Sequence, residues 1–353
     1  MTVTKIVKID PLHPDHHLVQ EAAHIVARGG LVVIPTETVY GIAVNMLDVQ
    51  AQARLYEIKQ RPKNKPFTVH IEEKMRIEEF AGRIPTAAYK LIEKFWPGPL
   101  TLLLKSVSGG MVGLRMPDNR VARDIIALAR VPVVCPSANL SGKPAPKNFT
   151  EAIKDMQGLV DYAIDAGPAT LGVESTIVDL TVDPAQFIRE GAITKEAISA
   201  VINTKQVLFI CTGNSCRSVM ADAYLRKLLL EKNRTDVFVS SAGIITLPGL
   251  GATSGTKQAL QQEGIDVSNY HSRGVTKEMI KKSDLILAME KIHEEHILRM
   301  APEVKNRLFL LKEFAKIDDS DLSIPDPIGK PLDTYTRTLA VIKEAVEKVS
   351  NLL

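Results

Sequence analysis

The sequence contains little cysteine and few aromatic residues. Three cysteines among 353 residues cannot form a disulfide framework, and Phe, Trp and Tyr together make up only 5% of the chain. No uninterrupted apolar run approaches the ~20 residues that a membrane-spanning helix requires. The opening stretch MTVTKIVKIDPLHPDHH also lacks the apolar segment of a secretory signal. The sequence therefore predicts a cytoplasmic protein with reduced thiols and no membrane association.

The chain also has little net charge. Lys and Arg number 44 against 41 Asp and Glu, and the resulting charge of +3 does not by itself indicate a nucleic-acid-binding protein. Apolar residues at 45% and charged residues at 24% are typical of a globular protein. Because 353 residues exceed the length of one typical domain, we expect two domains, each with its own core.

Strand-like and helix-like segments alternate along both halves of the chain. In the first half, strands are expected within residues 29–44, 100–106, 131–139 and 175–181, and helices within 48–61 and 194–202. In the second half, strands are expected within 206–210, 237–243 and 283–289, and helices within 218–230, 254–264, 291–301 and 333–349. This alternation predicts α/β folds with a parallel, doubly wound sheet. We place the domain boundary so that the domains are 1–203 and 204–353.

The stretch VLFICTGNSCRSVMA, residues 207–221, contains two of the three cysteines. Cys211 ends an apolar strand and a helix follows, so the loop between them can direct backbone N–H groups and a helix N-terminus at one phosphate dianion. Gly213 and Asn214 tolerate the positive φ angles of such a loop, and the Arg217 guanidinium can bind two phosphate oxygens. The same field should lower the pKa of Cys211 and make it nucleophilic. The alternative is a buried strand cysteine beside a surface arginine.

This stretch resembles the low-molecular-weight protein tyrosine phosphatase family, whose signature is Cys, five residues, Arg, Ser. The resemblance covers roughly residues 205–353, because SSAG, GIDVSNYHSRG and SDLILAMEK follow as later landmarks in the family's order. It implies a doubly wound parallel sheet and a two-step phosphoenzyme mechanism acting on a phosphorylated protein. The implied catalytic residues are the nucleophile Cys211, the phosphate-binding Arg217 and the general acid Asp326. The implied support of the phosphate loop comes from Gly213, Asn214, Ser215, Cys216 and Ser218, with Asn214 shaping the loop and Ser218 hydrogen-bonded to the thiolate.

Two departures from the family pattern bear on the substrate. Ser215 occupies a position where tyrosine-directed members tend to have a branched apolar residue and phosphoarginine-directed members have Thr. Ile328 stands where the family prefers an aromatic residue after the Asp-Pro pair. Both departures favour phosphoarginine over phosphotyrosine. Cys216 is a candidate for a reversible disulfide with Cys211, although it can equally be a packing residue.

Two other interpretations of the second half are an arsenate reductase and a phosphate-binding protein. Arsenate reductases of the same fold relay oxidation through downstream cysteines, and this sequence has none after Cys216. A phosphate-binding protein without catalysis is the non-enzymatic alternative. The presence of Cys211, Arg217 and Asp326 together favours the enzyme.

In the first half, polar residues follow several expected strands. The stretches PTETVYG, KQRPKNKP and CPSANLSG place hydroxyl groups, cations and small polar groups near strand ends. Together they suggest an anionic ligand bound at the carboxyl ends of a sheet. Because no Walker motif is present, a nucleotide's phosphates would have to be held mainly by Lys and Arg.

As a set, these stretches resemble the YrdC-type threonylcarbamoyl-AMP synthases. The landmarks PTETVYG, Lys59-x-Arg61, WPGPLT, LRMP, SANLSG, ESTIVD and IREG recur in order between residue 15 and about residue 200. The resemblance implies a twisted α/β domain that condenses L-threonine, bicarbonate and ATP into threonylcarbamoyl-AMP, with Mg²⁺ on the phosphates and no protein metal site. A partner transferase would then pass the threonylcarbamoyl group to an adenosine of tRNA. The implied threonine-binding residues are Thr38, His70, Arg115, Ser137 and Ser175, and the implied ATP-binding residues are Lys59, Arg61, Lys65, Asn139 and Arg189.

Two alternatives for the first half remain open. An RNA-binding module would use the basic residues without catalysis, and a carbamoyl transferase would depend on carbamoyl phosphate. Lys59 and Arg61, present together with Ser137 and Asn139, favour catalysis, because a protein that only binds RNA would not need the neutral pair.

Overall fold

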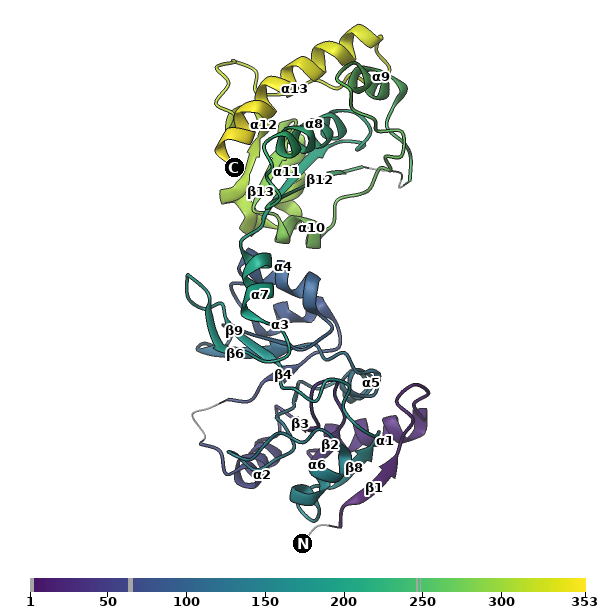
Figure 1. Cartoon of the computed structure of the whole chain (residues 1–353), viewed down its shortest axis with the longest axis vertical. Helices are drawn as coiled ribbons and strands as arrows, with labels where there is room; N and C mark the ends of the chain where they lie inside the picture. The colour runs from purple at the N-terminus through teal and green to yellow at the C-terminus, as the bar shows by residue number, and fades with distance from the viewer. Residues whose placement is uncertain (1–2, 63–65, 246, 248) are drawn as a thin grey trace. The chain divides into compact units, whose positions relative to one another are not determined.

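The computed structural model describes residues 3–62, 66–245, 247 and 249–353. The chain divides into two compact units, residues 1–202 and 203–353, which Figure 1 colours from purple to teal and from teal to yellow. The division falls one residue before the expected boundary. Among the described residues, no helix is both long and apolar enough to cross a membrane.

The first unit is a mixed sheet with helices on both faces. Its strands are β1 (Lys5–Lys8), β2 (Val32–Ile34), β3 (Gly41–Asn45), β4 (Val69–His70), β5 (Leu100–Lys105), β6 (Met111–Arg115), β7 (Val133–Val134), β8 (Tyr162–Asp165), β9 (Thr176–Asp179) and β10 (Gln186–Arg189). Its helices are α1 (His16–Ala27), α2 (Val49–Lys59), the 3₁₀ turn η1 (Lys74–Arg76), α3 (Ile77–Phe80), α4 (Thr86–Phe95), α5 (Arg120–Ala129), α6 (Phe149–Met156) and α7 (Lys195–Ile202).

The strand order of this sheet is β1-β8-β2-β3-β7-β4-β6-β5-β9-β10. The pairs β1·β8, β2·β8, β4·β6 and β5·β9 are parallel, whereas β2·β3, β3·β7, β4·β7, β5·β6 and β9·β10 are antiparallel. The α/β class is confirmed, but a parallel sheet is wrong for this unit. Antiparallel neighbours such as β3 and β7 come from distant segments, which local alternation does not reveal.

Alternate residues of β2 pack on opposite faces of the sheet. Val33 belongs to a core with α2, α4, α6 and α7, whereas Val32 and Ile34 pack with α1 and α5. α1 begins at an Asp15 cap that accepts hydrogen bonds from the His17 and Leu18 amides, and its buried residues Val19, Ala22, Ala23 and Val26 recur at helical spacing. Burial on both faces explains why β2 is apolar throughout.

The second unit is a four-stranded parallel sheet in the order β12-β11-β13-β14, which confirms the predicted doubly wound fold. Its strands are β11 (Lys205–Cys211), β12 (Val237–Gly243), β13 (Leu285–Ala288) and β14 (Leu308–Leu310). Its helices are α8 (Arg217–Glu231), α9 (Ser254–Gln262), α10 (Lys277–Lys282), α11 (Lys291–Met300), the 3₁₀ segment η2 (Pro302–Arg307), α12 (Leu311–Phe314) and α13 (Leu332–Leu352). Val207 and Phe209 of β11 pack toward α8, α9 and α13, and Leu208 and Ile210 pack toward α10 and α11.

Candidate active sites

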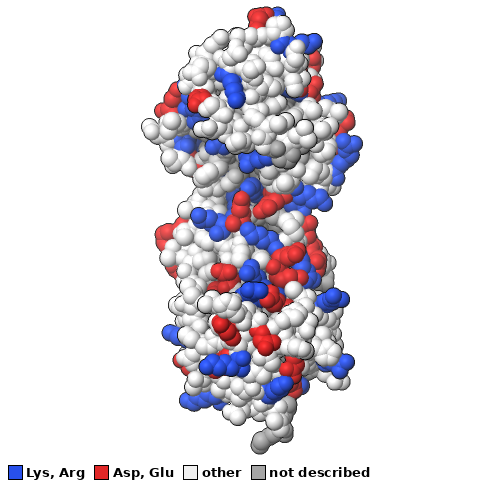
Figure 2. Space-filling view, turned by 90° about the vertical axis from the view of Figure 1, so that its right-hand side faces the viewer, with Lys and Arg blue, Asp and Glu red and all other residues white. Residues whose placement is uncertain are grey.

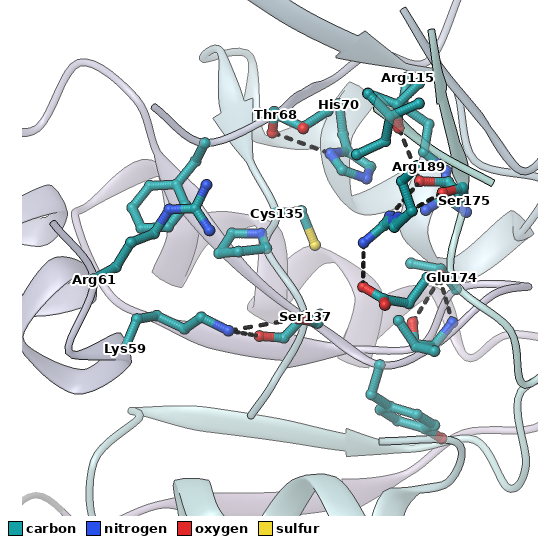
Figure 3. Close-up of a pocket in the computed structure, with 18 residues that line it drawn as sticks. Lys59, Arg61, Thr68, His70, Arg115, Cys135, Ser137, Glu174, Ser175 and Arg189 are labelled. Carbon is teal, nitrogen blue, oxygen red and sulfur yellow. Dashed lines mark hydrogen bonds and ion pairs between the residues drawn. The ribbon is translucent and has the colours of Figure 1, made fainter. Parts of the chain in front are cut away.

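The first unit contains a cavity of about 170 Å³ where several strand ends meet (Figure 3). Residues from the segments that follow β2, α2, β7 and β8 form its wall, together with the last residue of α2 and residues of β3, β4, β5, β6, β9 and β10. The predicted site residues that line it are Lys59, Arg61, His70, Arg115, Ser137, Ser175 and Arg189. Thr38 and Asn139 do not line the cavity but bond to residues that do. Lys65 lies outside the described residues.

Arg115 is fixed at the wall by groups behind it. Its Nη2 donates to Glu37 Oε1 at 2.6 Å and to Thr38 Oγ1 at 2.8 Å, and its Nε donates to the Gly98 carbonyl at 3.4 Å. The Arg115 and Glu37 side chains are each only 7% exposed. A buried arginine held by a carboxylate and a hydroxyl is preorganised to bind a further anion. Sequence reasoning did not single out Glu37, although it lies within PTETVYG.

Lys59 holds the turn that contains Ser137 in place through hydrogen bonds. Its Nζ donates to the carbonyls of Ser137 at 2.6 Å and Asn139 at 2.7 Å and to Asn139 Oδ1 at 3.1 Å (Figure 3). Burial, followed by the charge of Arg61, lowers the pKa of Lys59 to about 8, so the ammonium is still protonated at neutral pH. Its donors are therefore directed at the turn, whereas sequence reasoning expected them at the ATP phosphates.

His70 and Cys135 contribute uncharged groups to the cavity. Burial, followed by the charge of Arg115, lowers the pKa of His70 to about 3, so the ring is neutral. Its Nδ1 lies 3.3 Å from the Thr68 carbonyl, to which it donates, and Nε2 is consequently an acceptor. Burial raises the pKa of Cys135 to about 12, which makes this thiol unreactive at neutral pH.

Arg189, Ser175 and Glu174 form the opposite side of the cavity (Figure 3). Arg189 donates to the Ser175 carbonyl at 3.0 Å, to Ser175 Oγ at 3.2 Å and to the Glu174 carboxylate. Thr101 Oγ1 lies 2.9 Å from Ser175 Oγ. Thr101 and Glu174 were not predicted, although WPGPLT and ESTIVD contain them.

The carboxylates around the cavity do not form a metal site by themselves. Among the described residues, no group of three or more His, Cys, Asp or Glu side chains is placed to hold a metal ion. Glu174 is the acidic residue on the described wall, and it is paired with Arg189. A divalent cation at this cavity would therefore need ligands other than these side chains.

In the second unit, the loop between β11 and α8 surrounds the Cys211 sulfur. Ser218 Oγ lies 2.9 Å from Cys211 Sγ, and the Asn214 amide donates to the same sulfur at 3.3 Å. Asn214 has a positive φ of 53°. Its side chain donates to Ser218 Oγ at 3.0 Å and accepts from Tyr270 Oη at 2.7 Å and from the Arg273 amide at 2.9 Å. The structure thus brings the sequence-predicted residues Asn214 and Ser218 into contact with the Cys211 sulfur.

The Arg217 side chain is 1% exposed and forms ion pairs with two carboxylates. Its Nη1 donates to Glu290 Oε2 at 2.5 Å and to the Ile324 carbonyl at 2.8 Å. Its Nη2 donates to Asp326 Oδ2 at 2.6 Å and to Thr212 Oγ1 at 3.2 Å. Its Nε is buried and has no hydrogen-bond partner among the described residues. A buried guanidinium N–H of this kind is a donor suited to a phosphate oxygen.

The expectation that Cys211 has a lowered pKa is wrong. Burial raises the pKa of its thiol, and the hydrogen bond from Ser218, the charge of Arg217 and the Asn214 amide offset this only in part. The physical reason is that Cys211 is only 2% exposed, and removal from water disfavours the charged thiolate. The thiolate is therefore less favoured in this arrangement than the loop sequence suggests.

The remaining predicted residues lie around the same loop. Ser215 is half-buried, with its Oγ 3.7 Å from Cys216 Sγ, and Cys216 Sγ lies 3.3 Å from Thr253 Oγ1. The cysteines of the chain are free thiols in the structure. Ile328, after the Asp326-Pro327 pair, is 57% exposed.

Each unit is an α/β domain with one candidate anion-binding site, which is lined by arginines in the first unit and centred on a cysteine in the second. Residues 24–191 match the Sua5/YciO/YrdC family, described as telomere recombination, and residues 206–353 match the family described as low molecular weight phosphotyrosine protein phosphatase. The chain belongs to both families, and the recognition made from sequence is confirmed.

Relatives of the first unit are threonylcarbamoyl-AMP synthases. The protein from Pyrococcus abyssi is 40% identical over 209 residues, which are 57% of this chain and 62% of the relative. A putative synthase from Methanocaldococcus jannaschii is 36% identical over 198 residues, covering 54% of this chain and 94% of the relative. The chain thus spans only 62% and 59% of the length of the relatives from P. abyssi and Bacillus subtilis.

The second unit is similar to a protein-arginine-phosphatase from Geobacillus stearothermophilus. The two are 34% identical over 148 residues, which are 42% of this chain and 95% of that protein. Among solved structures, a variant of P. abyssi Sua5 has a TM-score of 0.54 and 25% identity, covering 87% of this chain and 98% of that chain.

Proposed function

We propose that the first unit synthesises threonylcarbamoyl-AMP from L-threonine, bicarbonate and ATP. The observation that supports this most strongly is the convergence of Arg61, Arg115 and Arg189 on one small cavity, where Glu174 is the acidic residue on the described wall. The substrates are a carboxylate, a bicarbonate ion and a triphosphate, which together need several cations. The threonylcarbamoyl-AMP synthases named above are relatives of this unit.

Each side chain has a distinct task in this proposal. Arg115, braced by Glu37 and Thr38, binds the threonine carboxylate, and neutral His70 accepts a hydrogen bond from a substrate hydroxyl or amine. Arg61 and Arg189 face the ATP phosphates. Lys59 acts indirectly, by holding the turn of Ser137 and Asn139.

The other participants follow from this chemistry. Mg²⁺ bound to ATP would supply further positive charge to the phosphates that Arg61 and Arg189 face. The product would then pass to a partner transferase that modifies an adenosine of tRNA. We propose that both reactions take place in the cytoplasm.

The alternatives differ in what they require of the protein. On the face shown in Figure 2, acidic and basic side chains are interspersed, in keeping with the net charge of +3, whereas an RNA-binding surface is expected to be predominantly basic. The test is pyrophosphate release by the full chain with ATP and Mg²⁺, omitting threonine or bicarbonate in turn. Release that needs neither, or that needs carbamoyl phosphate, contradicts the proposal.

For the second unit we propose a cysteine-dependent protein phosphatase. The supporting observation is the Cys211 sulfur, bonded by Ser218 and Asn214, beside a buried Arg217 whose Nε lacks a protein partner. Cys211 attacks phosphorus, so an S–P bond forms as the bond to the leaving atom breaks, and Asp326 donates a proton to that atom. Asp326 then takes a proton from water as the water attacks the phosphocysteine, releasing phosphate and the free thiolate.

We further propose phosphoarginine as the preferred substrate over phosphotyrosine. The Ser215 hydroxyl, which lies beside Cys216, can accept a hydrogen bond from a guanidinium. Ile328 offers no aromatic ring on which a phenol could stack. Similarity to the protein-arginine-phosphatase of G. stearothermophilus supports this choice. The test compares kcat/KM for phosphoarginine and phosphotyrosine peptides with the full chain. A preference for phosphotyrosine would contradict the specificity while leaving the phosphatase intact.

A further inference from the structure

His293 lies on the first turn of α11 and is 0% exposed. It is distinct from the proposed catalytic residues Cys211, Arg217 and Asp326. It is nevertheless in direct contact with the phosphate loop, because Thr212, the residue after the nucleophile, lies 2.9 Å from its Nε2.

The backbone of α11 determines which ring nitrogen of His293 carries the hydrogen. The Glu290 amide donates to Nδ1 at 3.0 Å, so Nδ1 must be an acceptor without a hydrogen. Burial, followed by the charge of Arg217, lowers the pKa of His293 to about 4, so the ring is neutral at neutral pH. The hydrogen is therefore on Nε2, which donates to Thr212 Oγ1.

These contacts belong to a closed circuit of hydrogen bonds. Thr212 Oγ1 accepts a second bond from Arg217 Nη2 at 3.2 Å, and Arg217 Nη1 returns to Glu290 Oε2 at 2.5 Å. The circuit starts at the Glu290 amide and ends at the Glu290 carboxylate. Because both lone pairs of the Thr212 hydroxyl are occupied, its own hydrogen remains for an anion bound in the loop.

We infer that His293 is a positioning residue of the second unit. It holds Thr212 as an acceptor for Arg217, so that the guanidinium presents its unpartnered Nε to a bound phosphate. The inference rests on the proposed phosphatase function for its catalytic consequence. Its structural content, a fixed tautomer and a phosphate affinity, can be measured independently.

Two amide substitutions separate the two ring nitrogens. His293→Asn keeps an acceptor near the position of Nδ1 and removes the donor at Nε2, whereas His293→Gln places an amide N–H near the position of Nε2. Loss of a hydrogen bond in a charged network predicts that His293→Asn weakens inorganic phosphate binding by about tenfold or more and lowers kcat/KM for p-nitrophenyl phosphate by a similar factor. His293→Gln should recover most of the phosphate affinity. His296→Asn, a half-buried histidine on the same helix, is the matched control and should change neither quantity.

A double-mutant cycle tests whether His293 acts through Thr212. In a Thr212→Val background, adding His293→Asn should cause no further loss of phosphate affinity, because the contact is already absent. Additive losses, or equal losses for His293→Asn and His293→Gln, would show that the histidine only supports the fold. Nitrogen-15 NMR of the labelled full chain should show the hydrogen of His293 on Nε2, and a hydrogen on Nδ1 would overturn the inference.

Failure of the phosphatase proposal gives a different result. If wild-type protein hydrolyses neither p-nitrophenyl phosphate nor a phosphoarginine peptide, the proposed function is wrong. Calorimetric titration with inorganic phosphate and the NMR tautomer would still decide the role of His293. Phosphate binding that is unchanged in His293→Asn contradicts the inference whether or not the protein is a phosphatase.

Discussion

Asp326 is expected to compete with bound phosphate for Arg217 and also to donate the proton to the leaving group. The substitution Asp326→Asn separates these two effects. In the structure its Oδ2 accepts from Arg217 Nη2 at 2.6 Å, with Arg217 1% and Asp326 32% exposed. A hydrogen bond between charged groups contributes about 1.5–3 kcal/mol, and partial exposure of the carboxylate places this pair near the lower end. Phosphate needs the same guanidinium. Removing the carboxylate should therefore tighten inorganic phosphate binding by about tenfold, since 1.4 kcal/mol corresponds to a factor of ten.

The same substitution removes the proton donor. Turnover of phenyl phosphate, whose leaving group must be protonated, should fall by about 10²–10⁴-fold, while p-nitrophenyl phosphate should lose much less. The measurements are the inhibition constant of phosphate and kcat for both esters. Asp333→Asn removes an exposed carboxylate that pairs with Arg337 and should leave all three unchanged.

Two results would refute this reasoning. Phosphate inhibition that is unchanged or weaker in Asp326→Asn would mean that the carboxylate does not compete for Arg217. Equal losses for the two esters would mean that Asp326 is not the proton donor, and Glu290 would become the next carboxylate to test.

Four further predictions concern both units. Arg61→Ala should remove several kcal/mol of transition-state stabilisation and so lower the rate of threonine-dependent pyrophosphate release by about 10²-fold or more. A wild-type rate in this variant would contradict the assignment. Cys211→Ser should abolish phosphatase turnover yet retain phosphate binding measured by calorimetry, because Arg217 and the loop amides remain. Since burial raises the pKa of Cys211, the rate of its alkylation by iodoacetamide should still increase with pH at pH 9.0, as followed by mass spectrometry. A rate that levels off near pH 7 would show that the pKa is lowered instead. Ser215→Ile should shift the ratio of kcat/KM from phosphoarginine toward phosphotyrosine by about ten- to hundredfold, and an unmoved ratio would remove Ser215 from the specificity argument.

The second unit was largely predictable from its sequence, whereas the sheet of the first was not. Residues 237–243 form β12 as expected, and α8 begins at Arg217, beside the expected start at Ser218. Long apolar strands followed by helices with clear starts carry their signal locally. In the first unit, Val69–His70 and Val133–Val134 are strands of two residues that pair with each other across the sheet. Pairing of this kind depends on tertiary contacts rather than on local pattern.

The candidate sites show the same division between local and distant information. The loop from Cys211 to Ser218 is contiguous, so its spacing alone indicated an anion site. Glu290, which pairs with Arg217, and His293, which contacts Thr212, were harder to find, because they lie at the start of a distant helix, α11. Lys59 was expected at phosphates because a lysine's sequence position does not reveal that carbonyls of Ser137 and Asn139 surround its ammonium.

The connection between the units fixes the ratio in which the two sites are produced. α7 ends at Ile202 and β11 begins at Lys205, so Asn203 and Thr204 alone separate the last helix of one unit from the first strand of the other. Each translated chain therefore supplies one copy of each site, in a ratio that transcription and translation of this chain cannot alter. On the proposed functions, a cell that raises its capacity for tRNA modification through this protein raises its phosphatase capacity by the same factor. Independent control must then come from substrate supply or from inhibitors acting on one site.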